Sequence, residues 1–225
     1  MRITEKNRAM NTIKIASLTA ALTAAFMVAP LFAEEPKTDG PAASPAAKPD
    51  EKEMMAKMME MAKPGDNHKI LADMVGTWSY KVKFWMAPDA PPSESSGTTV
   101  YKSIMGGRYV IGDVSGKMEM PGADGKMKKV EFKGMSIDAY DNVKQKFVST
   151  WIDNMGTGIM MLEGSYDPAT QSLTYTGTAE MMPGMTSKVR QVVKLADKKQ
   201  HSLEYYEDRG QGEMKTMEIN YTRKK

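Results

Sequence analysis

The chain of 225 residues contains no cysteine and only two histidines. Without thiols it has no disulfide staples, no thiol catalysis and no attachment through a lipidated cysteine. Stability must therefore come from a hydrophobic core, and the roughly 150 residues after Gly76 are enough to form one. Two histidines also provide few metal ligands. A zinc site needs clustered His, Asp or Glu at defined spacing, and the sequence shows no such cluster.

Long hydrophobic runs are scarce, and the longest lies near the N-terminus. The apolar run Ile15–Phe32 follows a basic segment and ends at the small residue Ala33, immediately before Glu34. This is the pattern of a secretory signal peptide. A membrane anchor is the alternative, but Pro30 and the alanine-rich composition argue against a stable span. We expect residues 1–33 to be removed and the mature protein to be periplasmic or secreted.

An excess of one charge is also absent from the expected mature chain. Residues 1–33 carry four Lys or Arg and one acidic residue, so 27 basic and 27 acidic residues remain after cleavage. When the net charge is zero and basic and acidic residues are interspersed, the chain has no concentration of positive charge that would attract nucleic acid. Nucleic-acid binding is therefore not expected.

Two kinds of segment precede the main domain. Residues 34–50 are rich in Pro, Ala and charge, without apolar periodicity, and read as a disordered linker. Residues 51–75 predict a methionine-rich amphipathic helix ended by Pro64-Gly65, then a short second helix that Asp66 caps. In this second helix four apolar side chains share one face: Ile70, Leu71, Met74 and Val75.

From Gly76 onward apolar residues recur at every second position. Trp78, Tyr80 and Val82 alternate with polar residues, as a half-buried strand requires. Nine further runs follow, separated by short turns. Residues 76–225 therefore predict a mainly β fold: a single antiparallel up-and-down lipocalin-like barrel of about ten strands, preceded by the helical segment. A two-sheet sandwich is the alternative. A barrel of this size has room for a small ligand.

Gly76-Thr77-Trp78 opens the first strand and Arg223 closes the last. This arrangement resembles the calycin superfamily, in which a G-x-W motif on the first strand meets a basic residue from the last. The resemblance implies barrel closure by Gly76, Trp78 and Arg223. A guanidinium over an indole face gains cation–π energy, and its donors can satisfy carbonyl groups at the barrel end.

A second resemblance rests on five ordered motifs spread over residues 64–225. The five motifs are MVGTW (74–78), IMGGRY (104–109), YDN (140–142), FVSTWIDNM (147–155) and MEINYTR (217–223). In order and spacing they are similar to the bacterial family catalogued as domain of unknown function 1579, a resemblance that implies no activity. The methionine-rich insert at 117–129 and the long methionine-rich helix depart from the family pattern.

Four residues are candidates for binding a ligand: Arg108, Tyr109, Trp151 and Asp153. The alternation of the 146–154 strand places Asp153 on the same face as Trp151, where it could pair with Arg108 inside the barrel. The alternative, which we favour, makes Asp153 a strand-end residue that satisfies the following turn. Similarly, Gly106-Gly107 before Arg108 is either an anion nest or, as we favour, a tight turn with positive φ.

Methionine is over-represented, with 20 of 23 in the expected mature chain. In the first helix the methionines fall within one arc of about 160°. Thioethers at Met54, Met58 and Met61 suit a soft metal such as Cu(I) or Ag(I). We favour the alternative that this face packs on the barrel as adaptable apolar filler. Oxidant scavenging by exposed methionine is a third possibility.

The sequence contains few recognisable catalytic motifs, and it predicts no catalytic residue and no cofactor. The sequence has no nucleophile elbow and no acid pair at a diagnostic spacing. His201 is a formal haem ligand, but its place after Lys198-Lys199-Gln200 favours an exposed side chain. We expect the barrel to bind a small apolar molecule non-covalently. The alternatives are a soft-metal or oxidant buffer, and an enzyme that uses barrel-lining acids such as Glu163 or Asp153.

Overall fold

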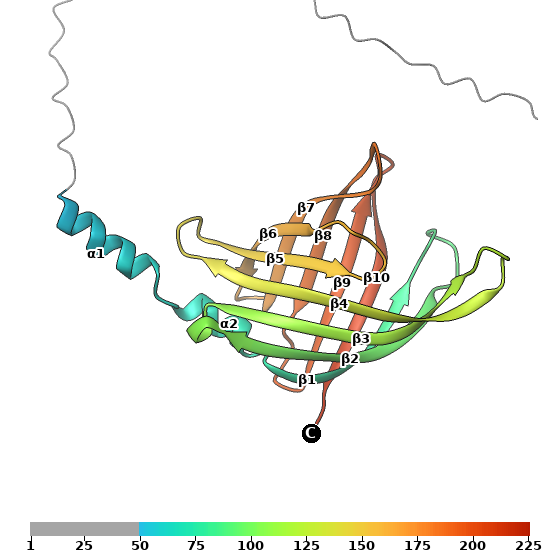
Figure 1. The fold of residues 1–225 in the computed structure, drawn as a ribbon, viewed down its shortest axis with the longest axis horizontal. Coiled ribbons are helices and arrows are strands. Elements are labelled where there is room, and N and C mark those ends of the chain that lie inside the picture. The colour runs from blue at the N-terminus through green and yellow to red at the C-terminus, as the bar shows by residue number, and fades with distance from the viewer. Residues whose placement is uncertain (1–49) are drawn as a thin grey trace, which may run out of the picture. The chain divides into compact units, whose positions relative to one another are not determined.

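The structure, a computed structural model, describes residues 50–225. The expected signal peptide (1–33) and the linker (34–50), except Asp50, lie outside the described residues. Two helices, α1 (Glu51–Met61) and α2 (Asp66–Ala72), precede ten strands and one short 3-10 turn, η1 (Met105–Gly107) (Figure 1). The strands are β1 (Gly76–Phe84), β2 (Ser93–Ile104), β3 (Tyr109–Pro121), β4 (Met127–Asp141), β5 (Lys146–Asp153), β6 (Met160–Asp167), β7 (Ser172–Met182), β8 (Met185–Lys194), β9 (Gln200–Asp208) and β10 (Glu213–Arg223).

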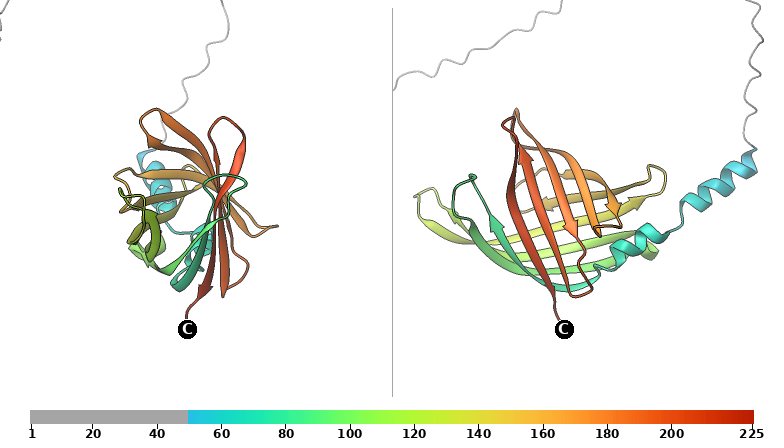
Figure 2. Two further views of the ribbon diagram at one scale, coloured as in Figure 1. Left: turned by 90° about the vertical axis from the view of Figure 1, so that its right-hand side faces the viewer. Right: turned by 180° about the vertical axis from the view of Figure 1, so that it is seen from behind.

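The ten strands form a closed barrel in which each strand pairs antiparallel with its neighbour in sequence, and β1 pairs with β10 (Figures 1 and 2). This confirms the predicted up-and-down barrel and excludes the two-sheet sandwich. Closure leaves no sheet edge with unpaired backbone groups. Because the strands alternate in direction, the turns after β2, β4, β6 and β8 share one barrel end. We call this the α2 end and the opposite one the far end.

Helix α2 packs against β3, β4 and η1. Leu71 and Met74 are buried in a cluster with Val110 and Phe147 of the barrel. The residue that caps α2 is Gly65 rather than the expected Asp66, and the backbone N–H of Gly65 donates to Nδ1 of His68 at 3.0 Å. The apolar face of α2 therefore covers the barrel core at this end.

Trp78 and Arg223 meet at the α2 end. Trp78 is 1% exposed and its Nε1 donates to the Met74 carbonyl at 2.8 Å. The Arg223 guanidinium carbon lies 4.2 Å from the centroid of the Trp78 ring. Arg223 also donates to three carbonyls, of Asp73 (2.7 Å), Val75 (2.6 Å) and Lys198 (2.6 Å). One side chain thus joins the last strand to the α2–β1 connection and the β8–β9 turn.

The expectation that α1 packs on the barrel is wrong, because no residue of α1 is buried. Its methionines are all exposed, including Met54 (49%), Met58 (62%) and Met61 (39%). The C-terminal turn of α1 is instead held by the Asn142 side chain, which donates to the carbonyls of Met61 and Lys63 at 2.8 Å each. Neither helix within residues 50–225 has the length and apolar content that a membrane crossing requires.

Candidate functional site

Arg108 and Tyr109 lie at the α2 end and are exposed. Arg108 donates to the carbonyl of Met105 at 3.0 Å, within its own turn. Gly106 and Gly107 have φ of 66° and 87°, as the predicted tight turn requires. Tyr109 precedes the buried Val110, so strand alternation points its side chain out of the barrel. No pair forms between Arg108 and Asp153.

Trp151 and Asp153 contact each other on the inner face of β5. The Trp151 Nε1 donates to Oδ2 of Asp153 at 2.7 Å, and Oδ1 of Asp153 accepts from the backbone N–H of Met155 at 2.9 Å. Asp153 thus satisfies the turn after β5, as expected, and also fixes the indole ring. Trp151 stacks on Phe132 with ring centroids 6.2 Å apart.

Two interpretations of single residues were wrong. Glu163 does not line the barrel, because it accepts hydrogen bonds from Lys144 (2.9 Å) and Lys146 (3.0 Å) on the outer surface. His201 is not exposed but buried, at 5% exposure. The strand begins at Gln200, so His201 is its second residue and faces inward beside Tyr221.

The barrel interior contains a polar group of side chains that the sequence pattern did not indicate. At its centre is Asp138 on β4, 7% exposed and paired in register with Val110 and Ser149. Ser136 donates to Oδ2 of Asp138 at 2.8 Å. Burial raises the pKa of Asp138, while hydrogen bonds from Ser149 and Ser136 act in the opposite direction. We call the following set the Asp138 cluster: Tyr101, Ser136, Asp138, Ser149, Tyr175 and Tyr221.

Three tyrosines of the Asp138 cluster come from strands far apart in sequence: β2, β7 and β10. Burial raises the pKa of Tyr101, Tyr175 and Tyr221, and the charge of Asp138 adds to each increase. Interaction between the Tyr101 and Tyr221 hydroxyls raises the pKa of Tyr101 further and acts to lower that of Tyr221. All three phenols therefore remain neutral hydrogen-bonding groups close to the Asp138 carboxyl.

His201 lies between aromatic rings beside the Asp138 cluster. Its ring stacks on Tyr221 with centroids 4.2 Å apart and meets Trp78 edge-on at 4.3 Å. Neither ring nitrogen has a hydrogen-bond partner among the described residues, and the same holds for the buried hydroxyl of Thr99. Burial, and then the charge of Arg223, lower the pKa of His201 to about 4. The imidazole is therefore neutral at physiological pH.

Toward the far end the inward-facing side chains are mostly apolar and half-buried. Among them are Val82, Phe132, Trp151 and Ile219, which belong to the same cluster as Trp78 and Tyr80. Two acidic side chains also face inward there: Asp153, which accepts from Trp151, and Glu207, which pairs with Arg209. The Trp151 ring lies against Gly134, where a Cβ would come within 2.4 Å of it. Glycine at this position lets the indole lie flat on the inner sheet wall. The interior thus combines apolar far-end walls with a polar floor near α2.

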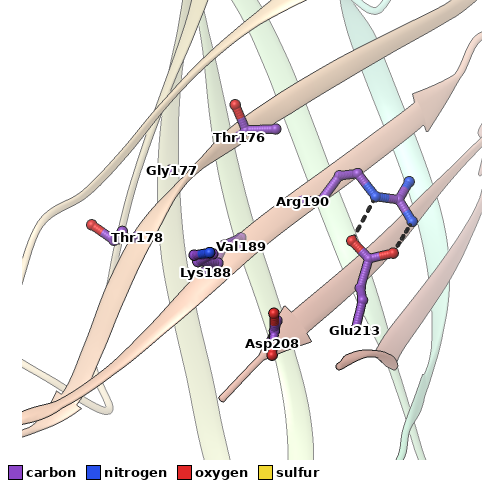
Figure 3. Close-up of a pocket in the computed structure, with 8 residues that line it drawn as sticks. All are labelled: Thr176, Gly177, Thr178, Lys188, Val189, Arg190, Asp208 and Glu213. Atoms are coloured by element: carbon purple, nitrogen blue, oxygen red, sulfur yellow. Dashed lines mark hydrogen bonds and ion pairs between the residues drawn. The ribbon is translucent and has the colours of Figure 1, made fainter. Parts of the chain in front are cut away.

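Two cavities lie apart from the far-end walls. One of about 220 Å³ lies at the α2 end, between α2 and the β6–β7 and β8–β9 turns, and its lining includes Met74, Trp78 and His201. The other, of about 490 Å³, is a shallow groove on the outer face of β7 and β8 (Figure 3). In that groove Arg190 is already paired with Glu213 through two hydrogen bonds of 2.8 and 2.6 Å.

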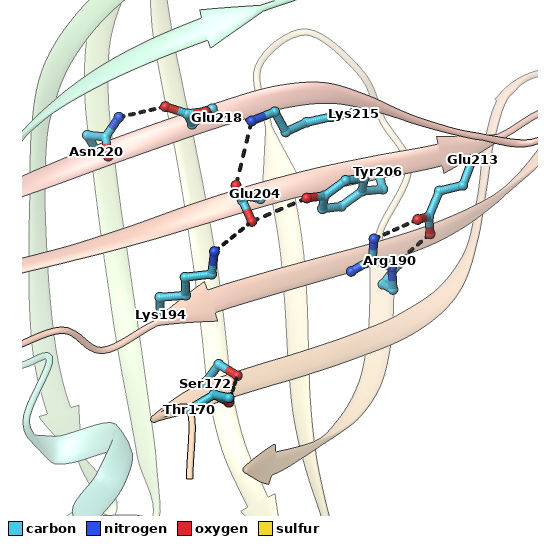
Figure 4. Close-up of polar contacts among 10 residues, drawn as sticks. All are labelled: Thr170, Ser172, Arg190, Lys194, Glu204, Tyr206, Glu213, Lys215, Glu218 and Asn220. Atoms are coloured by element: carbon cyan, nitrogen blue, oxygen red, sulfur yellow. Dashed lines mark hydrogen bonds and ion pairs between the residues drawn. The ribbon is translucent and has the colours of Figure 1, made fainter. Parts of the chain in front are cut away.

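The outer face of β8, β9 and β10 carries a ladder of ion pairs (Figure 4). Glu204 forms an ion pair with Lys194 at 3.2 Å and lies 3.6 Å from Lys215, which also pairs with Glu218. These charges neutralise one another across neighbouring strands, which supports the sheet. Within residues 50–225, no three His, Asp or Glu side chains gather as a metal site would require. The barrel interior is accordingly the best candidate site.

The closed barrel, its α2 cover and its buried Asp138 cluster define an antiparallel β-barrel protein with a polar interior floor. The model of a family described as protein of unknown function (DUF1579) matches residues 63–223, and the chain belongs to that family. The five sequence motifs indicated the same family.

Among solved structures, the chain is similar to the crystal structure of Rv2717c from M. tuberculosis. The TM-score is 0.51 at 14% sequence identity, and the match covers 72% of this chain and 100% of that chain. At this identity the likeness shows a shared barrel fold. A search of curated proteins finds no match.

Proposed function

We propose that this protein is an exported binding module that holds a small, largely apolar molecule inside the barrel. The observation that carries the proposal is the set of buried interior polar atoms without a partner among the described residues, in particular both nitrogens of His201 and the hydroxyl of Thr99. Such groups cost stability and are rare in folded proteins unless they serve a function. The half-buried apolar walls above them would receive the remainder of the molecule.

A bulky residue on the far-end wall tests this proposal. We expect Val82→Trp to weaken binding of the neutral dye Nile red by roughly tenfold or more, because the indole would occupy ligand space. Val143→Trp is the matched control, since Val143 is 78% exposed in the β4–β5 turn. Fluorescence titration measures both. A wild-type protein that does not bind the dye, or a Val82→Trp variant that binds it equally well, contradicts the proposal. Native mass spectrometry of freshly purified protein then identifies any resident ligand.

The exposure of α1 favours a second candidate function, soft-metal or oxidant buffering. Met54, Met58 and Met61 lie on one helix face at i, i+4 and i+7, and all three thioethers are accessible. Thioethers are ligands for Cu(I), and exposed methionine is readily oxidised. The same residues have no packing role within residues 50–225, since α1 buries none of its side chains.

Replacing Met54, Met58 and Met61 together with leucine separates these roles. We expect the free energy of unfolding to change by less than about 0.5 kcal/mol, because the three side chains are exposed. For the second candidate function, the wild type should bind Cu(I) under reducing conditions and the triple variant should not. Equal titration curves for the two proteins would eliminate this function. A large loss of stability would show that α1 packs in solution.

A further inference from the structure

The barrel interior has an unbalanced charge. Among residues 50–225, Asp138 is the one buried acidic side chain, and no Lys or Arg is buried. Its carboxyl accepts hydrogen bonds from the uncharged hydroxyls of Ser136 and Ser149. A buried carboxylate is costly unless a cation or several hydrogen-bond donors accompany it. The structure therefore contains a buried carboxyl group, and no described side chain supplies a counter-charge for its ionised form.

The surroundings of Asp138 favour a cation over an additional neutral group. Tyr101 of β2 packs against both buried clusters, the one that contains Tyr175 of β7 and the one that contains Tyr221 of β10. The charge of Asp138 acts on all three phenols, and an aromatic ring is negative on its face. Aromatic rings together with a carboxylate form a site for ammonium groups. His201, the nearby basic side chain, is neutral and so does not repel a cation. The charged Arg223 points instead to three backbone carbonyls at the barrel end.

We propose that the ligand of this barrel is an amphipathic amine, whose ammonium group binds Asp138 among the three tyrosines and whose apolar part lies along the far-end walls. This inference rests on the proposed function, because it assigns the ligand class for the same interior. The arrangement of the interior matches such a molecule: a polar floor next to α2, and the apolar side chains of Val82, Phe132 and Trp151 above it.

Three probes with the same alkyl chain test the ligand class: decylamine, decanol and decanoate. Calorimetric titration of the full exported chain at neutral pH gives their affinities. We expect decylamine to bind roughly 10- to 100-fold more tightly than decanol, since a charge-assisted hydrogen bond replaces a neutral one. Decanoate should bind most weakly, because its carboxylate would face that of Asp138.

The variant Asp138→Asn keeps the shape of the side chain and removes its charge. We expect it to lose the preference for decylamine while it still binds decanol. Asp113→Asn is the matched control, since Asp113 is exposed on the outer face of β3 and should leave the preference intact. The comparison of the three probes on the wild type does not depend on whether Asp138→Asn folds.

The outcomes separate the two proposals. If none of the three probes binds the wild type, the proposed function itself fails. If decanol or decanoate binds at least as well as decylamine, the barrel binds ligands but the assignment of an amine is wrong. The assignment also fails if a folded Asp138→Asn variant keeps the full preference for decylamine.

Discussion

Trp78→Ala is expected to lower the free energy of unfolding by about 4 kcal/mol, because a large buried side chain is removed. The indole is 1% exposed, donates to the Met74 carbonyl and packs against His201. Removing it leaves a large cavity between the barrel and α2. It also removes the ring over which the Arg223 guanidinium lies. Urea denaturation followed by circular dichroism measures the change.

Arg223→Ala should cost about 2 kcal/mol, because the cation–π contact and the hydrogen bonds to carbonyls are lost. Arg223→Lys should recover only part of this loss, since an ammonium cannot reproduce the planar fork that reaches Asp73, Val75 and Lys198. Arg108→Ala is the matched control. Arg108 is exposed and bonds within its own turn, so its loss should cost less than about 0.5 kcal/mol.

Combining Trp78→Ala with Arg223→Ala in a double-mutant cycle measures the interaction energy between the two side chains. We expect a coupling energy of about 1 kcal/mol, because the two side chains touch and cannot act independently. Additive single effects would show that the stacking of the guanidinium on the indole contributes nothing to barrel closure. The carbonyl hydrogen bonds alone would then account for the role of Arg223.

Strand periodicity predicted most of the fold. Alternation of apolar and polar residues located ten strands, since each inner face must be buried. The main difference is β2, which begins at Ser93 rather than near Thr98. Its first residues, Ser93–Ser96, pair with β1 although they lack an apolar pattern. Backbone pairing with a neighbour thus extends a strand beyond the part that its own side chains indicate.

The candidate site was harder to predict, because it depends on which strands face one another. Tyr101, Asp138 and Tyr221 are separated by dozens of residues, and no local period shows that they meet. One signal was available for Asp138. It follows Phe132, Gly134 and Ser136 at intervals of two, which places an ionisable side chain on the inner face of β4. His201 was misjudged because Lys198 and Lys199 belong to the turn, whereas the strand already begins at Gln200.

Helix α1 shows a different limit of sequence patterns. An apolar arc shows which residues can be buried together, but not whether a surface is present to bury them. In α1 the arc at Met54, Met58 and Met61 was correct as a pattern, yet none of these side chains is covered within residues 50–225. Packing against the barrel core therefore does not explain the methionines of α1.

His201→Phe is expected to make the protein more stable and less sensitive to acid. At neutral pH the variant should gain about 1 kcal/mol or more, because carbon replaces two buried nitrogens that have no partner among residues 50–225. The acid effect follows from the lowered pKa of about 4 in the folded protein. Between about pH 6.5 and pH 4 the unfolded chain takes up a proton at this histidine and the folded protein does not, so stability falls as pH decreases.

From about pH 7 to about pH 4.5 this single histidine should remove roughly 2–3 kcal/mol from the wild type, a loss that His201→Phe lacks. Carboxyl groups titrate in both proteins, so the difference between the two pH profiles isolates His201. His68→Gln is the control, because it removes the other histidine and should retain most of the acid-dependent loss. Identical pH profiles for wild type and His201→Phe would mean that the imidazole is hydrated or hydrogen-bonded in solution. A variant that is more stable but binds Nile red poorly would instead indicate that His201 is kept for ligand binding at the expense of stability.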